Sequence, residues 1–229
     1  MPKPTSVNHV GNGHLMEFQI PLFASILQIG SFRWKFHDTN SQIPNAPFKI
    51  MVRDAAVANP ELRRLLSHIL NSAIVKKGFY GCFDALADIP LAMTPVITTL
   101  SDRSSTPMVI LDYKNKRILG APKPKTKIII VDDVLSFGDS KLEAIKLAQE
   151  YDLEVVGILV LVDYGIGTAQ LIELNFNIKV ASAFTIEEFL ETCRDVIPED
   201  ESKMILSWLT KNLRNNPKLL PESIKPQHY

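Results

Sequence analysis

From about residue 83 onward, short apolar runs alternate with segments whose apolar residues recur every three or four positions. The runs predict buried strands, and the spaced segments predict amphipathic helices. Strands that are apolar on both faces need helices on both sides, which is typical of a mainly parallel α/β sheet. The predicted strands are Phe83–Ile89, Met108–Leu111, Lys127–Val131, Glu154–Val162 and Ile178–Ala183. The predicted helices are Leu91–Leu100, Ser140–Tyr151, Gly167–Leu174, Ile186–Cys193 and Glu201–Leu213.

The pattern of the N-terminal third is less regular. Apolar residues at helical spacing predict a helix over Leu15–Leu27, which Pro21 kinks or splits. Two further strands are predicted at Gly30–Lys35 and Phe48–Asp54, on either side of a polar turn region.

A longer amphipathic helix follows these strands. Asn59 and Pro60 form its start signal, and Gly78 is its stop signal. Residues 1–14 are polar and predict a flexible arm. We expect one domain over residues 15–196, with 15–60 as a distinct N-terminal segment, and a helical tail over 197–229.

Composition narrows the classes of function. The 25 basic and 25 acidic residues cancel, so the chain has no overall field that would attract nucleic acid or an anionic membrane. The longest apolar runs are too short to cross a bilayer, and the polar N-terminus has no pattern of a secretion signal. Two cysteines and five scattered histidines predict no metal site made of these residues. We therefore expect a soluble cytoplasmic protein that binds neither nucleic acid nor membrane.

One stretch, IIIVDDVLSFGDSKLEAI, combines groups that suit a sugar phosphate. Asp132 and Asp133 end an apolar strand and could accept hydrogen bonds from vicinal hydroxyls or help to hold a magnesium-bound ligand. The turn that follows offers Ser136, Gly138 and Ser140 next to the positive end of a helix dipole, which favours phosphate. A pair of acids that only caps the strand–helix turn is the alternative interpretation.

This stretch resembles the phosphoribosyl pyrophosphate motif of the type I phosphoribosyltransferases, and its ending KLEAI resembles orotate phosphoribosyltransferase in particular. Further segments are similar in the same order. They are GSFRWK at Gly30–Lys35, PFKIMVR at Pro47–Arg53, FDALADIPLAMTPV at Phe83–Val96 and VLVDYGIGTAQLIEL at Val160–Leu174. The similarity runs from about Leu15 to Glu191.

The resemblance implies a twisted, mainly parallel sheet with helices on both faces and a small N-terminal hood over residues 15–60. It implies a pentosyltransferase of pyrimidine nucleotide biosynthesis that moves phosphoribosyl from phosphoribosyl pyrophosphate to orotate or a similar base. Mg²⁺ would arrive with the ligand rather than on a direct protein site, and the partner would be a second copy in a homodimer.

The same resemblance assigns roles to individual residues. Catalysis falls to Asp132, Asp133, Lys114 and Lys116, although the two lysines read equally well as a solvated loop. The turn after the two acids would bind the phosphoribosyl group, and a third set of residues would bind the base and the pyrophosphate. The turn consists of Ser136, Phe137, Gly138, Asp139 and Ser140, and the third set of Lys35, Phe48, Leu91, Ala92 and Tyr164.

Several of these positions depart from the family pattern. Leu91, Ala92 and Met93 stand where the family has TGG, so side chains replace bare backbone in the pyrophosphate loop. Asp139 brings a carboxylate to a phosphate turn. Tyr164 stands where the family arginine meets the orotate carboxylate, and a tyrosine cannot form the bidentate charged pair.

Three hypotheses follow from these features. The first is a working phosphoribosyltransferase, and the second is a catalytically impaired protein of the same fold that acts as a nucleotide-binding or regulatory module. The third is dinucleotide binding through Gly165–Gln170, which lacks the third small residue of that fingerprint.

Overall fold

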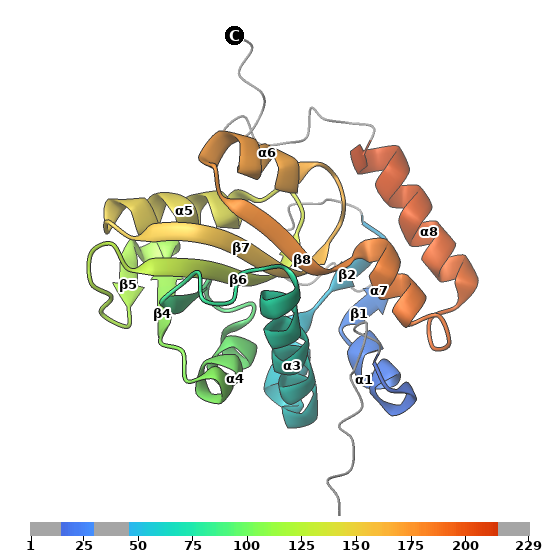
Figure 1. Cartoon of the computed structure of the whole chain (residues 1–229). Coiled ribbons are helices and arrows are strands. Elements are labelled where there is room, and N and C mark those ends of the chain that lie inside the picture. The colour runs from blue at the N-terminus through green and yellow to red at the C-terminus, as the bar shows by residue number, and fades with distance from the viewer. Residues whose placement is uncertain (1–14, 30–45, 215–229) are drawn as a thin grey trace, which may run out of the picture.

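The computed structural model describes residues 15–29 and 46–214 of the chain (Figure 1). Its centre is a six-stranded sheet with the order β5-β4-β3-β6-β7-β8. All neighbours in it are parallel except β5, which pairs antiparallel with β4. The strands are β3 Ala85–Asp88, β4 Met108–Asp112, β5 Arg117–Leu119, β6 Lys127–Leu135, β7 Glu154–Asp163 and β8 Lys179–Thr185. The predicted mainly parallel α/β fold is confirmed.

Helices cover both faces of this sheet (Figure 1). The helices α5 (Asp139–Glu150) and α6 (Thr168–Phe176) lie on one face, and α3 (Pro60–Lys76) and α4 (Thr94–Ser104) lie on the other. Side chains of β6 alternate between the two resulting cores, with Ile128 and Ile130 on the α5 side and their odd-numbered neighbours on the α3 side.

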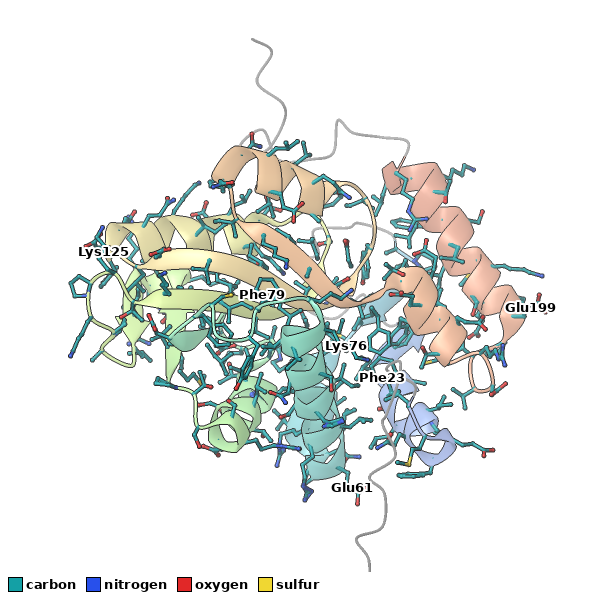
Figure 2. All side chains as sticks on the ribbon, viewed as in Figure 1. Phe23, Glu61, Lys76, Phe79, Lys125 and Glu199 are labelled. Carbon is teal, nitrogen blue, oxygen red and sulfur yellow. The ribbon has the colours of Figure 1, made fainter. Side chains whose placement is uncertain are left out.

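A smaller unit stands at the β8 end of the sheet. It contains the antiparallel pair of β1 (Leu27–Ile29) and β2 (Phe48–Ile50), together with α7 (Ile186–Thr192) and α8 (Glu199–Leu209). Phe23 joins this unit to the main domain, because its ring lies 5.1 Å from that of Phe184 and 4.9 Å from that of Phe189 (Figure 2). Such aromatic contacts add specific packing to the burial of apolar area.

The N-terminal predictions are confirmed only in part. Pro21 does split the expected helix, into η1 (Glu17–Gln19) and α1 (Ile20–Ala24). The predicted strand Gly30–Lys35, with the candidate site residue Lys35, lies outside the described residues.

The predicted strand Phe48–Asp54 is wrong in its second half. The strand ends at Ile50, and Val52–Ala58 forms the helix α2. Three alanines favour a helix there, and Asp54 is an acid in its first turn, although the apolar alternation before them continues the strand pattern.

The helix α3 follows its sequence signals closely. The Asn59 side chain accepts hydrogen bonds from the backbone of Glu61 and Leu62, which caps the first turn, and Gly78 follows the end with a φ of 73°. Glu61 and Lys76 mark the two ends of this helix in Figure 2.

Phe79 follows the end of α3, and its ring packs against the sheet. A Cβ atom on Gly157 would lie 2.3 Å from the Phe79 ring, so the ring packs directly on bare strand backbone.

Two boundaries near the expected site differ from prediction. The strand β6 continues four residues beyond Val131, so Asp132 and Asp133 lie within it rather than after it. The predicted helix Leu91–Leu100 begins later, at Thr94, and residues 89–93 form a loop. Proline at the second position of the observed helix fits this later start.

The two cysteines are free thiols in different settings. Cys193 is fully buried and burial raises its pKa to about 12, whereas Cys82 is exposed. Within residues 15–29 and 46–214, the longest apolar helical segment falls short of what a membrane span needs.

Candidate functional site

The two adjacent acids of β6 have different surroundings but also interact with each other. Asp132 is paired with Lys141 of α5. The negative charge of Asp132 and a side-chain hydrogen bond with it both raise the pKa of Asp133, so the two carboxyl groups lie close together. Of the two, Asp133 is the one that is partly open to solvent.

Asp132 is buried and ion-paired. The Nζ atom of Lys141, in the first turn of α5, lies 2.5 Å from Asp132 Oδ2 and also donates to the carbonyl of Val134 at 2.5 Å. Only 2% of Asp132 and 4% of Lys141 are exposed. The sequence analysis missed Lys141, because nothing in a lysine at the start of a helix indicates that it folds inward.

Asp133 is half-buried, and within the described part of the chain it forms no salt bridge like that of Asp132. Its Oδ1 accepts a hydrogen bond from the backbone N–H of Val134 at 2.7 Å. Burial, and then the negative charge of Asp132, raise the pKa of Asp133 to about 7, while Lys141 acts in the opposite direction. Asp133 is thus the acid of β6 that can change its charge and meet a ligand.

The turn after β6 has the backbone form that a phosphate site needs. Gly138 has a φ of 87°, and a Cβ atom there would lie 2.9 Å from Thr168 Cγ2. Thr168 in turn donates from its hydroxyl to the carbonyl of Ser136 at 2.5 Å, which fixes the turn against the start of α6. The first turn of α5 begins directly afterwards, with Asp139 and Ser140 half-buried.

Phe137 has a structural position rather than a ligand-facing one. It is 7% exposed and belongs to the apolar core on the α3 side. The Phe137 side chain therefore anchors the turn, and the assignment of Ser136, Phe137, Gly138, Asp139 and Ser140 to the phosphoribosyl group stays a prediction.

A third acid, Asp88, ends β3 directly beside β6. It lies opposite Val131 in the pairing of the two strands and is completely buried. Thr94 donates to its Oδ2 at 2.5 Å, while its Oδ1 has no hydrogen-bond partner within the described part of the chain. Burial raises the pKa of Asp88 to about 6, the hydrogen bond from Thr94 lowers it, and the charge of Asp132 adds to the rise.

The loop that joins Asp88 to Thr94 contains the predicted pyrophosphate residues. Leu91 is 62% exposed, Ala92 is half-buried and Met93 is fully buried. Because this loop follows the carboxyl end of the parallel strand β3, it lies at the edge of the sheet where ligands of open α/β sheets bind. Leu91 and Ala92 lie in this loop, and their assignment to the base and pyrophosphate stays a prediction. Asp88 is a further candidate that the sequence analysis passed over as part of a strand.

Tyr164 and Phe48, the predicted base residues, lie in one packed aromatic cluster. Their ring centroids are 5.3 Å apart, and the Trp208 ring of α8 lies 6.4 Å from that of Phe48. Tyr164 is 5% exposed, and burial, with a smaller effect of the Asp133 charge, raises its pKa. The two side chains pack against each other in the core, and their assignment to the base stays a prediction.

An arginine distant in sequence does reach the loop after β7. Arg214 Nη2 donates to the Tyr164 carbonyl at 3.1 Å and to Glu187 Oε1 at 2.6 Å. A Cβ atom on Gly165 would lie 3.0 Å from that nitrogen, so the guanidinium rests on bare backbone. No pattern in the sequence connects Arg214 with this loop.

Lys114 and Lys116 lie in a tight turn between β4 and β5. Lys114 belongs to the 3-10 helix η3 (Tyr113–Asn115), Lys116 has a φ of 49°, and both are exposed. The Lys116 carbonyl accepts a hydrogen bond from the Tyr151 hydroxyl at 3.2 Å, which fixes the turn to α5. Their assignment as catalytic lysines stays a prediction.

Comparison with known proteins gives relatives for this arrangement. No family model matches the chain. It is 31% identical over 123 residues to the orotate phosphoribosyltransferase of Pyrococcus abyssi, a match that covers 51% of the chain and 66% of that relative. The aligned part therefore spans about two thirds of the relative's length. The name of this relative is that of a pentosyltransferase, the class expected from the resemblance.

Solved structures share the fold. The Leishmania donovani UMP synthase structure matches with a TM-score of 0.70 and 23% identity, over 84% of this chain and 42% of that one. The Aeropyrum pernix orotate phosphoribosyltransferase matches with a TM-score of 0.62 and 21% identity, over 75% of this chain and 96% of that one. By its sequence relatives and its fold, the chain belongs to the type I phosphoribosyltransferases, and its named relatives are orotate phosphoribosyltransferases.

Proposed function

We propose that the chain transfers a phosphoribosyl group from phosphoribosyl pyrophosphate to a pyrimidine-type base, with orotate as the base that its relatives suggest. A ring nitrogen of the base would form a bond to the anomeric carbon as the bond to pyrophosphate breaks, and the nitrogen would lose its proton. Because positive charge develops on the ribose in such a reaction, catalysis depends on positioning and on electrostatics.

The observation that supports this proposal best is the junction of β6, its turn and α5. The turn presents backbone N–H groups beside the positive end of a twelve-residue helix, which favours the 5-phosphate. Asp133 lies just before the turn with one side open, where it can accept hydrogen bonds from the ribose hydroxyls. Asp132 and Lys141 form the buried support beneath it.

Magnesium fits the charges of this edge of the sheet. Asp132 is paired with Lys141, and its charge also raises the pKa of Asp88 and of Asp133, so the three acids are electrostatically linked. The described residues contain no cluster of three acids that could hold a metal on its own, so Mg²⁺ would be held mainly by the substrate. Asp88 Oδ1 has no donor within the described residues. When bound with the pyrophosphate, Mg²⁺ would neutralise the charge of the leaving group. Asp88 and Asp133 are the carboxylates on this edge that Lys141 leaves without a salt bridge.

A catalytically impaired nucleotide-binding module is the second candidate. Three features of the site favour this candidate, because they hinder the binding of phosphate or of a base. They are the carboxylate of Asp139 at the phosphate turn, the buried Met93 in the pyrophosphate loop and the closed aromatic cluster at Tyr164. The names of the relatives favour the enzyme. We propose that it acts in the cytoplasm, in the synthesis of pyrimidine nucleotides. Both candidates share the ribose-phosphate site.

Two measurements test the proposal in order. Calorimetry with ribose 5-phosphate and phosphoribosyl pyrophosphate should detect binding, which Asp133→Asn together with Ser140→Ala should weaken. A steady-state assay of pyrophosphate release with a panel of bases then separates the enzyme from the binding module. Absence of binding by either sugar phosphate at millimolar concentration would remove both candidates.

A further inference from the structure

The carboxylate of Asp88 is in an energetically unfavourable position as it stands. It is fully buried, and Thr94 supplies its single hydrogen bond within the described chain, to one oxygen only. A buried carboxylate without compensation is costly, so such a group usually has a cation or a full set of donors. Lys141 does not fill this role, because its ammonium is already shared between Asp132 and the Val134 carbonyl.

Structural roles do not account for Asp88. It caps no helix, since α4 begins after Met93 and the hydrogen bond to Asp88 comes from a threonine hydroxyl rather than from a backbone N–H. The aspartate at the end of the neighbouring strand provides a contrast. Asp112 ends β4 and is satisfied by Asn115 at both oxygens and by Arg117 at 2.8 Å.

The position of Asp88 places it next to the proposed site. β3 and β6 are neighbouring parallel strands, so their carboxyl ends lie at the same edge of the sheet. The loop after β7 contacts the phosphate turn from the other side of β6, through Thr168 and Ser136. Asp88 therefore flanks the ribose-phosphate turn on the side away from that contact.

We propose that Asp88 is a direct protein ligand of a divalent cation, which links the end of β3 to the pyrophosphate of the substrate. This rests on the proposed function and adds a carboxylate–metal bond to the set of contacts expected there. Mg²⁺ is usually held by one or two carboxylates together with substrate phosphates and water, so one aspartate suffices. The cation would satisfy Asp88 Oδ1 and remove the repulsion between this carboxylate and pyrophosphate.

The test measures metal and anion binding separately from turnover. Mn²⁺ replaces Mg²⁺ as the probe, and free Mn²⁺ is followed by its paramagnetic resonance signal in the presence of protein and pyrophosphate. Asp88→Asn should weaken Mn²⁺ retention by roughly ten-fold or more, the minimum expected for loss of a metal-site group. Metal-free pyrophosphate should bind the variant at least as well as the wild type, because a negative charge is gone.

Matched variants make the result specific. Asp112→Asn removes the acid at the end of the adjacent strand and should leave Mn²⁺ retention unchanged. Thr94→Val removes the single donor of Asp88 but keeps its charge, so Mn²⁺ retention should persist even if Asp88→Asn folds poorly. Equal Mn²⁺ retention by the wild type and Asp88→Asn, or its loss in Thr94→Val when that variant is folded, would overturn the proposal.

Ribose 5-phosphate without metal serves as the reference ligand. If it binds the wild type and Asp88→Asn alike while Mn²⁺ retention does not change, the metal ligand is wrong and the proposed function stands. If it binds neither protein, the proposed function itself fails.

Discussion

The ammonium nitrogen of Lys141 lies 2.5 Å from a carboxylate oxygen of Asp132, and less than a tenth of either side chain is exposed. Removing one partner of a buried pair leaves the other charge uncompensated, at a cost of about 3–5 kcal/mol. We therefore expect Lys141→Met to lower the free energy of unfolding by about that amount in denaturant titrations.

Two further variants check that explanation. Lys146→Met removes an exposed partner of Glu143 on the same helix and should cost at most about 1 kcal/mol. Asp132→Leu combined with Lys141→Met should recover most of the lost stability, because no buried charge remains. A double variant as unstable as Lys141→Met alone would show that packing, not charge, accounts for the loss.

Asp133 should make stability depend on pH. Its pKa in the folded protein is about 7, above the ordinary value of 3.8, so the folded state retains this proton longer than the unfolded chain. The contribution of Asp133 to stability is thus fully present below about pH 4 and is lost as the pH rises through 7.

Asp133→Asn should accordingly be more stable than the wild type at pH 8, and the gap should close at acidic pH. Thermal unfolding of both proteins across this range measures the difference. A gap that does not change with pH would mean that Asp133 has an ordinary pKa.

Gly138 should tolerate no side chain. Gly138→Ala places a Cβ atom 2.9 Å from Thr168 Cγ2 and requires a left-handed backbone, so the phosphate turn should shift and ribose 5-phosphate should bind more weakly. Gly81→Ala is the matched control, because Gly81 has a φ of 76° and no atom of the described residues lies within 4 Å of its Cβ position. It should cost only the backbone strain of about 1–2 kcal/mol and leave ligand binding intact.

The pairing of Arg214 with Glu187 bears on the choice of base. Because the Arg214 guanidinium is already paired with Glu187, we expect it to contribute little to orotate binding. The wild type should therefore bind orotate little more tightly than uracil. Glu187→Gln frees the guanidinium and should raise orotate affinity roughly ten-fold, the effect of about 1.4 kcal/mol, while uracil stays unchanged.

Calorimetry with both bases measures this selectivity. Arg194→Gln, which breaks a surface pair with Glu191 on α7, serves as the control and should alter neither base. If Glu187→Gln leaves orotate affinity where it was, Arg214 does not face the base. Tyr164→Arg, an obvious way to restore the family residue, would instead bury a charge in the aromatic cluster.

The expected homodimer stays a prediction from the resemblance. Sedimentation equilibrium at micromolar concentration should find a species of twice the 25.7 kDa chain mass. A single species at the chain mass would contradict it.

Local signals in the sequence predicted much of the fold. The cap at Asn59 and the stop at Gly78 located α3, and the apolar run of β7 located the strand to within one residue. The strand limit at Val131 failed because carboxylates usually end an apolar run, whereas here Lys141 neutralises Asp132 inside the sheet. The helix predicted from Leu91 began too early because the loop before Thr94 is itself apolar.

The candidate site was less predictable, because its decisive contacts connect distant residues. The turn at Gly138 was visible from its residue types. The Lys141 side chain points inward to Asp132, and Asp88 Oδ1 has no hydrogen-bond partner within the described residues. Both features depend on how the strands and helices pack together, which only the three-dimensional fold establishes. Arg214 lies fifty positions from the carbonyl it contacts.

The packing of α8 over the aromatic cluster also affects how the chain is made. Synthesis proceeds from the N-terminus, so Phe48 and Tyr164 leave the ribosome well before Trp208 and Arg214, which cover them. A nascent chain halted before α8 would hold its aromatic rings uncovered, and transiently exposed apolar surface is what chaperones and proteases recognise. The proposed base side of the site is therefore completed only after the last helix has emerged.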